Sequence, residues 1–241
     1  MLKDQYYVGG IIAERFVEVD AARLLLIIAR FARESEELPT HLQCRPSNLF
    51  VGFFTPEYYL HKLDFLLRYP RYFIYELIEL FRLGLIVDQH RDELLTIIRS
   101  IERRQEPELM TQQFRKFWRG AYERLDDVEA WWHARQLIYI GFEPRGNARP
   151  WKYYFITDRG MAEADRLITE VPHARWYADR IALLYRYFGG LSAAALKDLQ
   201  YSHDAYRQAQ LDEFIPDLSP EEIEGHFAHV FGEPLAVEVG A

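Results

Sequence analysis

The spacing of hydrophobic and polar residues along the chain predicts mainly helices. From Val19 to Arg33 nearly every position is apolar, which is typical of a largely buried helix of about four turns. Residues 34–48 contain two prolines and many polar side chains, so they are predicted to form a loop. A second helix is expected from Thr55, which can cap it, and Pro56, which suits a first helical position.

The next boundary is Pro70, because proline cannot continue the hydrogen bonds of the preceding helix. Residues 71–86 follow with an apolar stripe, and Gly84 lies where a helix of this length would end. Two helices separated by one sharp break resemble a helix-turn-helix. Two helices that simply pack together explain the pattern equally well. The stripe consists of Phe73, Leu77, Leu80 and Phe81.

Residues 91–133 form a highly charged stretch with helical periodicity, divided by Pro107 and Gly120. Its charged positions are expected to face solvent, and its aromatic residues are expected to lie in the core or in an interface. The stripes are Leu94, Ile97, Ile98 and Ile101, followed by Phe114, Phe117, Trp118 and Tyr122.

Residues 137–142 and 151–157 are rich in aromatic and β-branched side chains and are predicted to pair as a hairpin. The loop between them, "EPRGNARP", contains Gly-Asn and two prolines, which are not expected inside a strand. Thr157 or Asp158 is predicted to cap a helix that runs to about Glu170. A hairpin that leads directly into a helix is typical of the wing of a winged-helix module.

The fold expected from these patterns is mainly α, a helical protein with a winged-helix-like module and one β-hairpin. That module is assigned to residues 1–172, with a helical insertion at 91–133, because a wing ordinarily follows its recognition helix within a few residues. Residues 173–241 are assigned to a C-terminal acidic helical segment. In its last helix Ser219 and Glu222 have the spacing of a capping box.

Composition narrows the classes of function. Among 241 residues the net charge is −8, which argues against a surface devoted to nucleic acid. Residues 133–176 carry seven basic against five acidic side chains, whereas residues 177–241 carry four against eleven. Cys44 is the single cysteine and the most apolar run, residues 24–29, is too short to span a membrane, so a cytoplasmic protein is expected.

Two stretches carry a resemblance to known proteins: "LHKLDFLLRYPRYFIYELIELFRLGLI" at 60–86 and "YYFITDRGMAEADRLI" at 153–168. They resemble winged-helix accessory proteins of bacterial conflict systems. The layout is similar to SocA-like (Panacea) antitoxins, and more closely to the middle component of ABC-three-component (Lamassu-type) antiphage systems. The resemblance implies protein partners, namely an SMC-like ATPase and an effector subunit, and it brings no catalytic residues.

Combinations of residues that could support catalysis or metal binding are weak. His226 and His229, three residues apart, could hold a metal with Glu222, but exposed histidines near an acidic helix are more often ordinary surface residues. His41, Cys44 and His61 could also bind zinc, but they lack a standard spacing. Cys44 lies in no sequence motif typical of a catalytic nucleophile. His203 and Asp204 are adjacent in the sequence, and adjacent side chains do not face each other on a helix. We therefore predict no catalytic residue, no metal site and no cofactor.

Two functions remain open. The first is an interaction subunit of a DNA-associated complex, favoured by the acidic charge and the abundant aromatic residues. The second is a transcription regulator with the helix near Arg71 in the major groove, where a homodimer would double the basic patch. That helix offers only Arg71 and Arg82 as bases. The residues expected to contact nucleic acid or a partner are Arg71, Arg145, Arg149 and Lys152.

Overall fold

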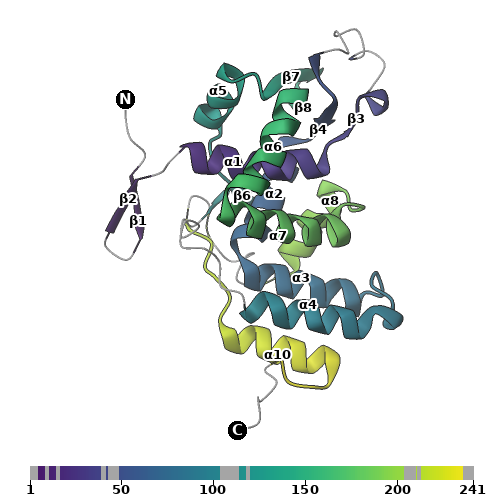
Figure 1. The fold of residues 1–241 in the computed structure, drawn as a ribbon. Helices are drawn as coiled ribbons and strands as arrows, with labels where there is room; N and C mark the ends of the chain where they lie inside the picture. The colour runs from purple at the N-terminus through teal and green to yellow at the C-terminus, as the bar shows by residue number, and fades with distance from the viewer. Residues whose placement is uncertain are drawn as a thin grey trace. The chain divides into compact units, whose positions relative to one another are not determined.

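The computed structural model of the protein describes residues 5–8, 11–14, 17–38, 42, 49–103, 114–117, 120–203, 210 and 213–235. Helices are the main secondary structure, so the predicted mainly helical class is confirmed (Figure 1). His41, Cys44, Pro107 and Asp204 lie outside the described residues. None of the described helices is both long enough and apolar enough to cross a membrane.

The chain divides into two compact units that alternate along the sequence. Unit 1 consists of residues 1–64 and 122–193, and unit 2 consists of residues 65–121 and 194–241. The division therefore differs from the predicted single boundary after residue 172. The segment that interrupts unit 1 is 65–121, rather than the predicted insertion at 91–133.

Unit 1 contains a four-stranded antiparallel sheet in the order β3-β4-β8-β7. Its long strands, β7 (Ile138–Arg145) and β8 (Ala148–Ile156), form the predicted hairpin. The short strands β3 (Arg33–Glu34) and β4 (Gly52–Phe54) extend it, with β4 pairing against residues 154–156. The hairpin is thus part of a sheet, and the expectation of one isolated hairpin is wrong.

The hairpin turn is much shorter than predicted, because both prolines of "EPRGNARP" lie within strands. Only residues 146 and 147 form the turn, and Gly146 has a φ of +54°, a conformation that glycine adopts without strain. Pro144 coincides with an irregular register between Glu143 and Arg145. Pro150 lies beyond the residues of β8 that pair with β4. Neither proline therefore interrupts a two-sided ladder.

The sheet buries aromatic side chains on both of its faces. One face holds Phe53, Tyr153 and Phe155 in a cluster with Leu38, Leu42 and Phe50. On the other face Tyr154 meets the ring of Trp132 edge-on, with centroids 6.1 Å apart. The indole Nε1 of Trp132 donates to the carbonyl of Ala21 at 3.0 Å, which links that face to α1.

The helices of unit 1 surround α1 (Val17–Phe31), which contacts α5 (Asp126–Ala134), α6 (Asp158–Glu170) and α7 (Pro172–Phe188). α2 (Glu57–Arg68) begins in unit 1, where the buried Asp64 forms an ion pair of 2.6 Å with the buried Arg23 of α1. The Thr157 side chain accepts from the Gly160 N–H, so the predicted cap of α6 is confirmed.

Unit 2 is built on α3 (Pro70–Arg82), which packs between α4 (Arg91–Arg103) and α10 (Pro220–Phe231). α8 (Ala193–Ser202) begins at its second boundary. The Tyr69 hydroxyl accepts from the Phe114 N–H at 2.9 Å and donates to the carbonyl of Ile215 at 3.3 Å. The predicted capping box of Ser219 and Glu222 starts α10 and is confirmed.

The sequence predicted helices throughout residues 91–133, and this prediction is wrong. Helices α4 and α5 occupy its two ends, but residues 115–117 and 120–122 pair as strands β5 and β6. A further pair, β1 (Gln5–Val8) and β2 (Ile11–Glu14), was also not expected. Strands of three or four residues are too short to show a periodicity that distinguishes them from a helix.

Gly160 provides a test of the close contact between α6 and the sheet. A Cβ there would overlap the carbonyl oxygen of Leu137 and would lie 2.9 Å from Ile156 Cγ1. Gly160→Ala should lower the free energy of unfolding by about 2 kcal/mol. Gly225→Ala in α10, where a Cβ meets nothing within 4 Å, should raise it by up to about 1 kcal/mol. Urea unfolding followed by circular dichroism measures both variants. Equal changes in their free energies of unfolding would contradict the prediction.

Candidate functional site

The β7–β8 hairpin carries three of the four predicted contact residues, but Lys152 is not exposed. Its side chain is 12% exposed, and its Nζ donates to Glu57 of α2 at 2.6 Å and to Glu129 of α5 at 2.7 Å. Burial lowers the pKa of Lys152, but the two carboxylates outweigh it and raise the pKa above 10.5. Lys152 is therefore a charged and largely buried residue of β8 whose ammonium group already has two carboxylate partners.

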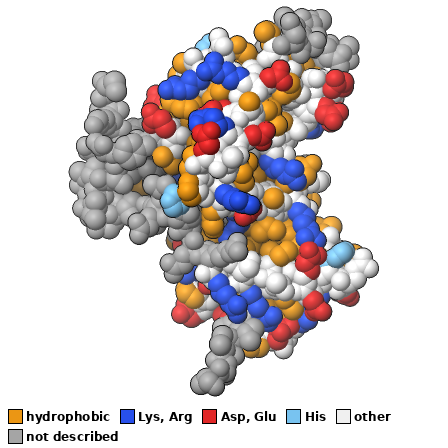
Figure 2. Space-filling model, in the orientation of Figure 1, with side chains coloured by type: hydrophobic (Ala, Val, Ile, Leu, Met, Phe, Trp, Pro, Cys, Tyr) orange, Lys and Arg blue, Asp and Glu red, His pale blue; other side chains and the backbone are white. Residues whose placement is uncertain are grey.

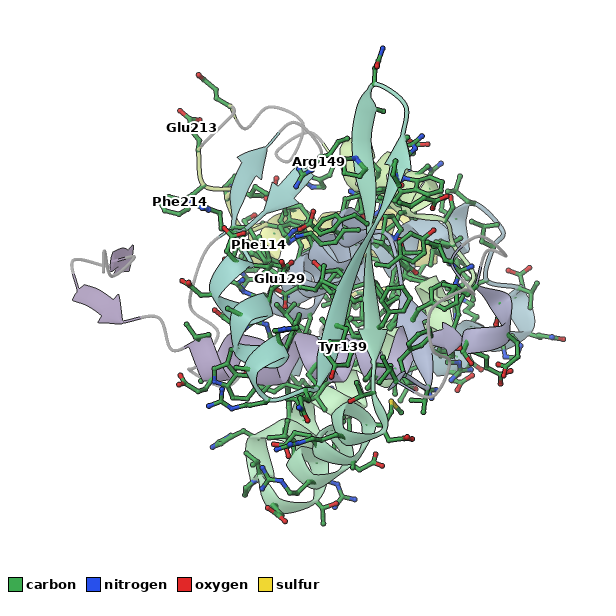
Figure 3. All side chains as sticks on the ribbon, turned by 90° about the horizontal axis from the view of Figure 1, so that it is seen from above. Phe114, Glu129, Tyr139, Arg149, Glu213 and Phe214 are labelled. Atoms are coloured by element: carbon green, nitrogen blue, oxygen red, sulfur yellow. The ribbon has the colours of Figure 1, made fainter. Side chains whose placement is uncertain are left out.

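Arg149 lies nearer to the turn and remains largely accessible. Its guanidinium is 3.3 Å from the Glu57 carboxylate, yet its side chain is 57% exposed. An exposed ion pair of this kind is weak and can be exchanged for another anion. Figure 3 shows Arg149 toward the turn of the hairpin and Tyr139 toward its base.

Arg145 is preorganised by an aromatic ring instead of a carboxylate. Its guanidinium lies 4.4 Å from the ring centre of Trp151, which is itself 38% exposed. On the other strand Phe142 is 54% exposed. Stacking leaves the N–H groups at the edge of a guanidinium able to bind a carboxylate or a phosphate. The hairpin thus carries two accessible cations and two accessible aromatic rings near its turn. Trp151 lies with Arg145 on one face, and Phe142, which pairs with Lys152 in the ladder, lies on the other face.

Arg71, the fourth predicted contact residue, belongs to unit 2 and not to the unit that holds the hairpin. Its Nη1 is 3.0 Å from the Asp217 carboxylate and also 3.0 Å from the carbonyl oxygen of Leu218. Burial raises the pKa of Asp217, and the attraction of Arg71 only partly offsets this effect. Arg71 therefore connects α3 to the segment that leads into α10.

Helix α5 was not recognised in the sequence as part of this site. It ends at Ala134, four residues before β7 begins, and Glu129 connects it to the hairpin through Lys152 and the Tyr154 hydroxyl. Its acidic residues are Asp126, Asp127 and Glu129, and it contains no lysine or arginine. The position of α5 directly before the hairpin could have identified it as part of this site. It was not identified because residues 91–133 were assigned to an insertion.

Over the described part of the face in Figure 2, basic and acidic side chains are interspersed. This agrees with the pairing of several arginines inside unit 1. Arg166 contacts Glu163 and Glu170 along α6, and Arg124 contacts Asp126. Such paired cations contribute little net attraction for phosphate.

Those histidines singled out in the sequence that the structure describes do not converge on a metal site. His226 Nε2 lies 2.9 Å from the Glu79 carboxylate and its ring stacks on Tyr75, whereas Glu222 caps α10. His203 packs edge-on against Tyr75. Within the described residues, no three histidine, cysteine or acidic side chains are grouped so that they could hold a metal ion.

Comparison with known proteins gives no relative, since no family model, no curated protein and no solved structure matches the chain. The resemblance to winged-helix accessory proteins stays a prediction from the sequence.

The buried Lys152 cluster predicts a difference between two neighbouring cations. Lys152→Met should lower the free energy of unfolding by about 2 kcal/mol, because it leaves Glu57 and Glu129 close together without a cation. Arg149→Met is the matched control and should change it by less than about 0.5 kcal/mol. Urea unfolding measures both, and a similar small loss in the two variants would show that the cluster does not support the hairpin.

His61 predicts how stability depends on pH. It is 2% exposed, and burial lowers its pKa below 6.5 although nearby carboxylates, led by Glu57, oppose the shift. The unfolded chain therefore binds a proton before the folded chain does, so stability is lost as the pH falls below about 6.5. Thermal unfolding of His61→Gln should show a smaller loss between about pH 7 and pH 5 than the wild type. His133→Gln, at an exposed position, should retain the wild-type loss.

Proposed function

We propose that the protein is a non-catalytic accessory subunit that contacts a partner protein through a winged-helix-like scaffold in unit 1. The resemblance described above supports a place in a DNA-associated antiphage complex with an SMC-like ATPase and an effector subunit. The surface proposed for the contact consists of Phe142, Arg145, Arg149 and Trp151, which we call the hairpin tip.

The order of elements in unit 1 supports a winged-helix-like scaffold. β4 lies between α1 and α2 in the chain and pairs with β8, while β7 and β8 follow α5 after a short connection. A wing hairpin that directly follows a helix is the arrangement expected of such modules. With this assignment, residues 65–121 interrupt the module between α2 and α5, and α5 takes the position of the recognition helix.

The observation that carries the proposal of a protein partner is the charge of α5. A helix in this position would approach the phosphates of DNA, yet its exposed carboxylates are those of Asp126 and Asp127 and it contains no lysine or arginine, while Glu129 is paired with Lys152. Nucleic-acid affinity arises mainly from cations that neutralise phosphates. Exposed aromatic rings such as Phe142 and Trp151 are instead enriched in protein interfaces.

A DNA-binding regulator is the second candidate, and the exposed Arg145 and Arg149 are the observation that favours it. The helix first considered for the major groove does not support it. Of the thirteen residues of α3, eight are buried, and α3 packs between α4 and α10. We therefore expect the isolated protein to bind duplex DNA weakly and without sequence preference.

Reversing the charge of the hairpin tip tests the proposal. Arg145→Glu with Arg149→Glu should leave folding nearly intact, because both side chains are at exposed strand positions next to the turn. Association with the ATPase partner should weaken by at least about tenfold at low salt, and the difference should shrink as salt screens the charges. The matched control is Arg159→Glu with Arg166→Glu on α6, which makes the same charge change at exposed positions.

Co-purification with the ATPase from nuclease-treated extract and binding to duplex DNA separate the candidates. Loss of the ATPase in the hairpin variant, with retention in the control, supports the subunit. Loss of DNA binding alone supports the regulator. If both associations persist, the hairpin tip is not a contact surface and the proposed function fails.

A further inference from the structure

A second feature of the chain that has the chemistry of a recognition site lies in unit 2, on α4. The segment that follows α10, residues 232–235, is bound there by two arginines that are eight residues apart on α4. Arg91 contacts one carboxylate oxygen of Glu233 at 2.6 Å, and Arg99 contacts the other at 3.0 Å. One carboxylate is therefore held between two guanidinium groups that extend from α4 at positions eight residues apart.

Arg99 also binds the backbone of the segment, because it donates to the carbonyls of Pro234 and Leu235 at 3.3 and 3.2 Å. Arg91 donates to the carbonyl of Phe231, the last residue of α10, at 3.0 Å. The Leu235 N–H donates to the Glu224 carboxylate at 3.0 Å, and the Leu235 residue is 6% exposed. The site thus recognises a carboxylate, a run of carbonyl groups and one buried aliphatic side chain, which is how proteins bind short extended peptides.

Aromatic rings of α10 hold the two arginines in place. The Arg91 guanidinium lies 5.7 Å from the ring centre of Phe231, and the Arg99 guanidinium lies 5.8 Å from that of Phe227. Both rings are buried and therefore fixed. The site is consequently preorganised by α4 and α10, without a requirement for the segment itself.

The ion pairs that hold the segment are partly exposed to water. The segment is joined to α10 through Gly232, whose φ of +72° places it in the left-handed region that ends the helix. The side chains of Arg91, Arg99 and Glu233 are 36%, 21% and 35% exposed, so water competes for each ion pair. An external carboxylate can therefore compete with Glu233 for the two arginines, and displacement of the whole segment also requires Leu235 to leave its buried position.

We propose that the Arg91–Arg99 site on α4 docks a short Glu-Pro-aliphatic segment of a protein partner, and that residues 233–235 occupy it within the free chain. The chain's own segment identifies the chemistry of the ligand, because it fits the site in every contact described above. The site belongs to unit 2, and its failure would leave the function proposed for the hairpin tip unchanged.

Binding of a labelled peptide with the sequence of residues 230–237, measured by fluorescence anisotropy, tests the proposal. The full chain with Glu233→Ala and Leu235→Ala, here the opened variant, should bind the peptide at least about tenfold more tightly than the wild type. The reason is that the tethered segment competes in the wild type at an effective concentration on the order of millimolar. A peptide with glutamine in place of its glutamate serves as the matched control and should bind weakly to both proteins.

A charge exchange separates recognition from simple loss of folding. Arg99→Glu in the opened variant should abolish binding of the native peptide, and a peptide with lysine at the glutamate position should restore it. The proposal is overturned if the folded opened variant shows no saturable binding up to about millimolar peptide, or if Arg99→Glu leaves binding unchanged. Concentration-dependent dimers of the wild type that Arg99→Glu dissociates would also overturn it, because the occupant would then be a second copy of the chain.

Discussion

The ammonium group of Lys152, held between Glu57 and Glu129, is the interaction on which the arrangement of unit 1 depends. Burying a charge is costly unless it is paired and hydrogen-bonded, and here two carboxylates and the Tyr154 hydroxyl complete the network. The three charged residues come from β8, α2 and α5. The hairpin is therefore held at the middle of β8 by α2, which is distant in the sequence, and by α5, which directly precedes the hairpin.

This anchoring divides the hairpin into a supported base and a projecting tip. From residue 152 to residue 156, β8 is supported by helices and by β4. Nearer the turn, β7 and β8 pair only with each other. Pro144 and Pro150 lack backbone donors in that outer part, which discourages the addition of a further strand. Recognition at the tip must then proceed through side chains, and the accessible ones are the rings and guanidinium groups described above.

Local signals in the sequence predicted most of the helix boundaries. Pro70, Thr157 and Ser219 each act on the adjacent turn of backbone, so their effect can be read from a few residues. The three-residue strand β4 could not be predicted, because its pairing with β8 joins positions about a hundred residues apart. Two of the predicted contact residues were misinterpreted for the same reason. Lys152 and Arg71 were interpreted as exposed cations, but Lys152 pairs with Glu57, 95 residues away, as well as with Glu129, and Arg71 pairs with Asp217, 146 residues away.

The charge distribution of unit 1 limits what can bind there. Helix α5 presents carboxylates directly before a hairpin whose tip presents Arg145 and Arg149. A duplex carries the same negative charge along its whole backbone, so any approach that brings phosphate toward the tip also brings phosphate toward α5. The surface of a folded protein does not carry charge of a single sign. It can place acidic side chains against the tip and basic side chains against the helix, and the cost of desolvating each charge is then offset by a partner of opposite sign. A partner surface with both signs of charge, as expected of the protein partner proposed above, would satisfy the two elements together.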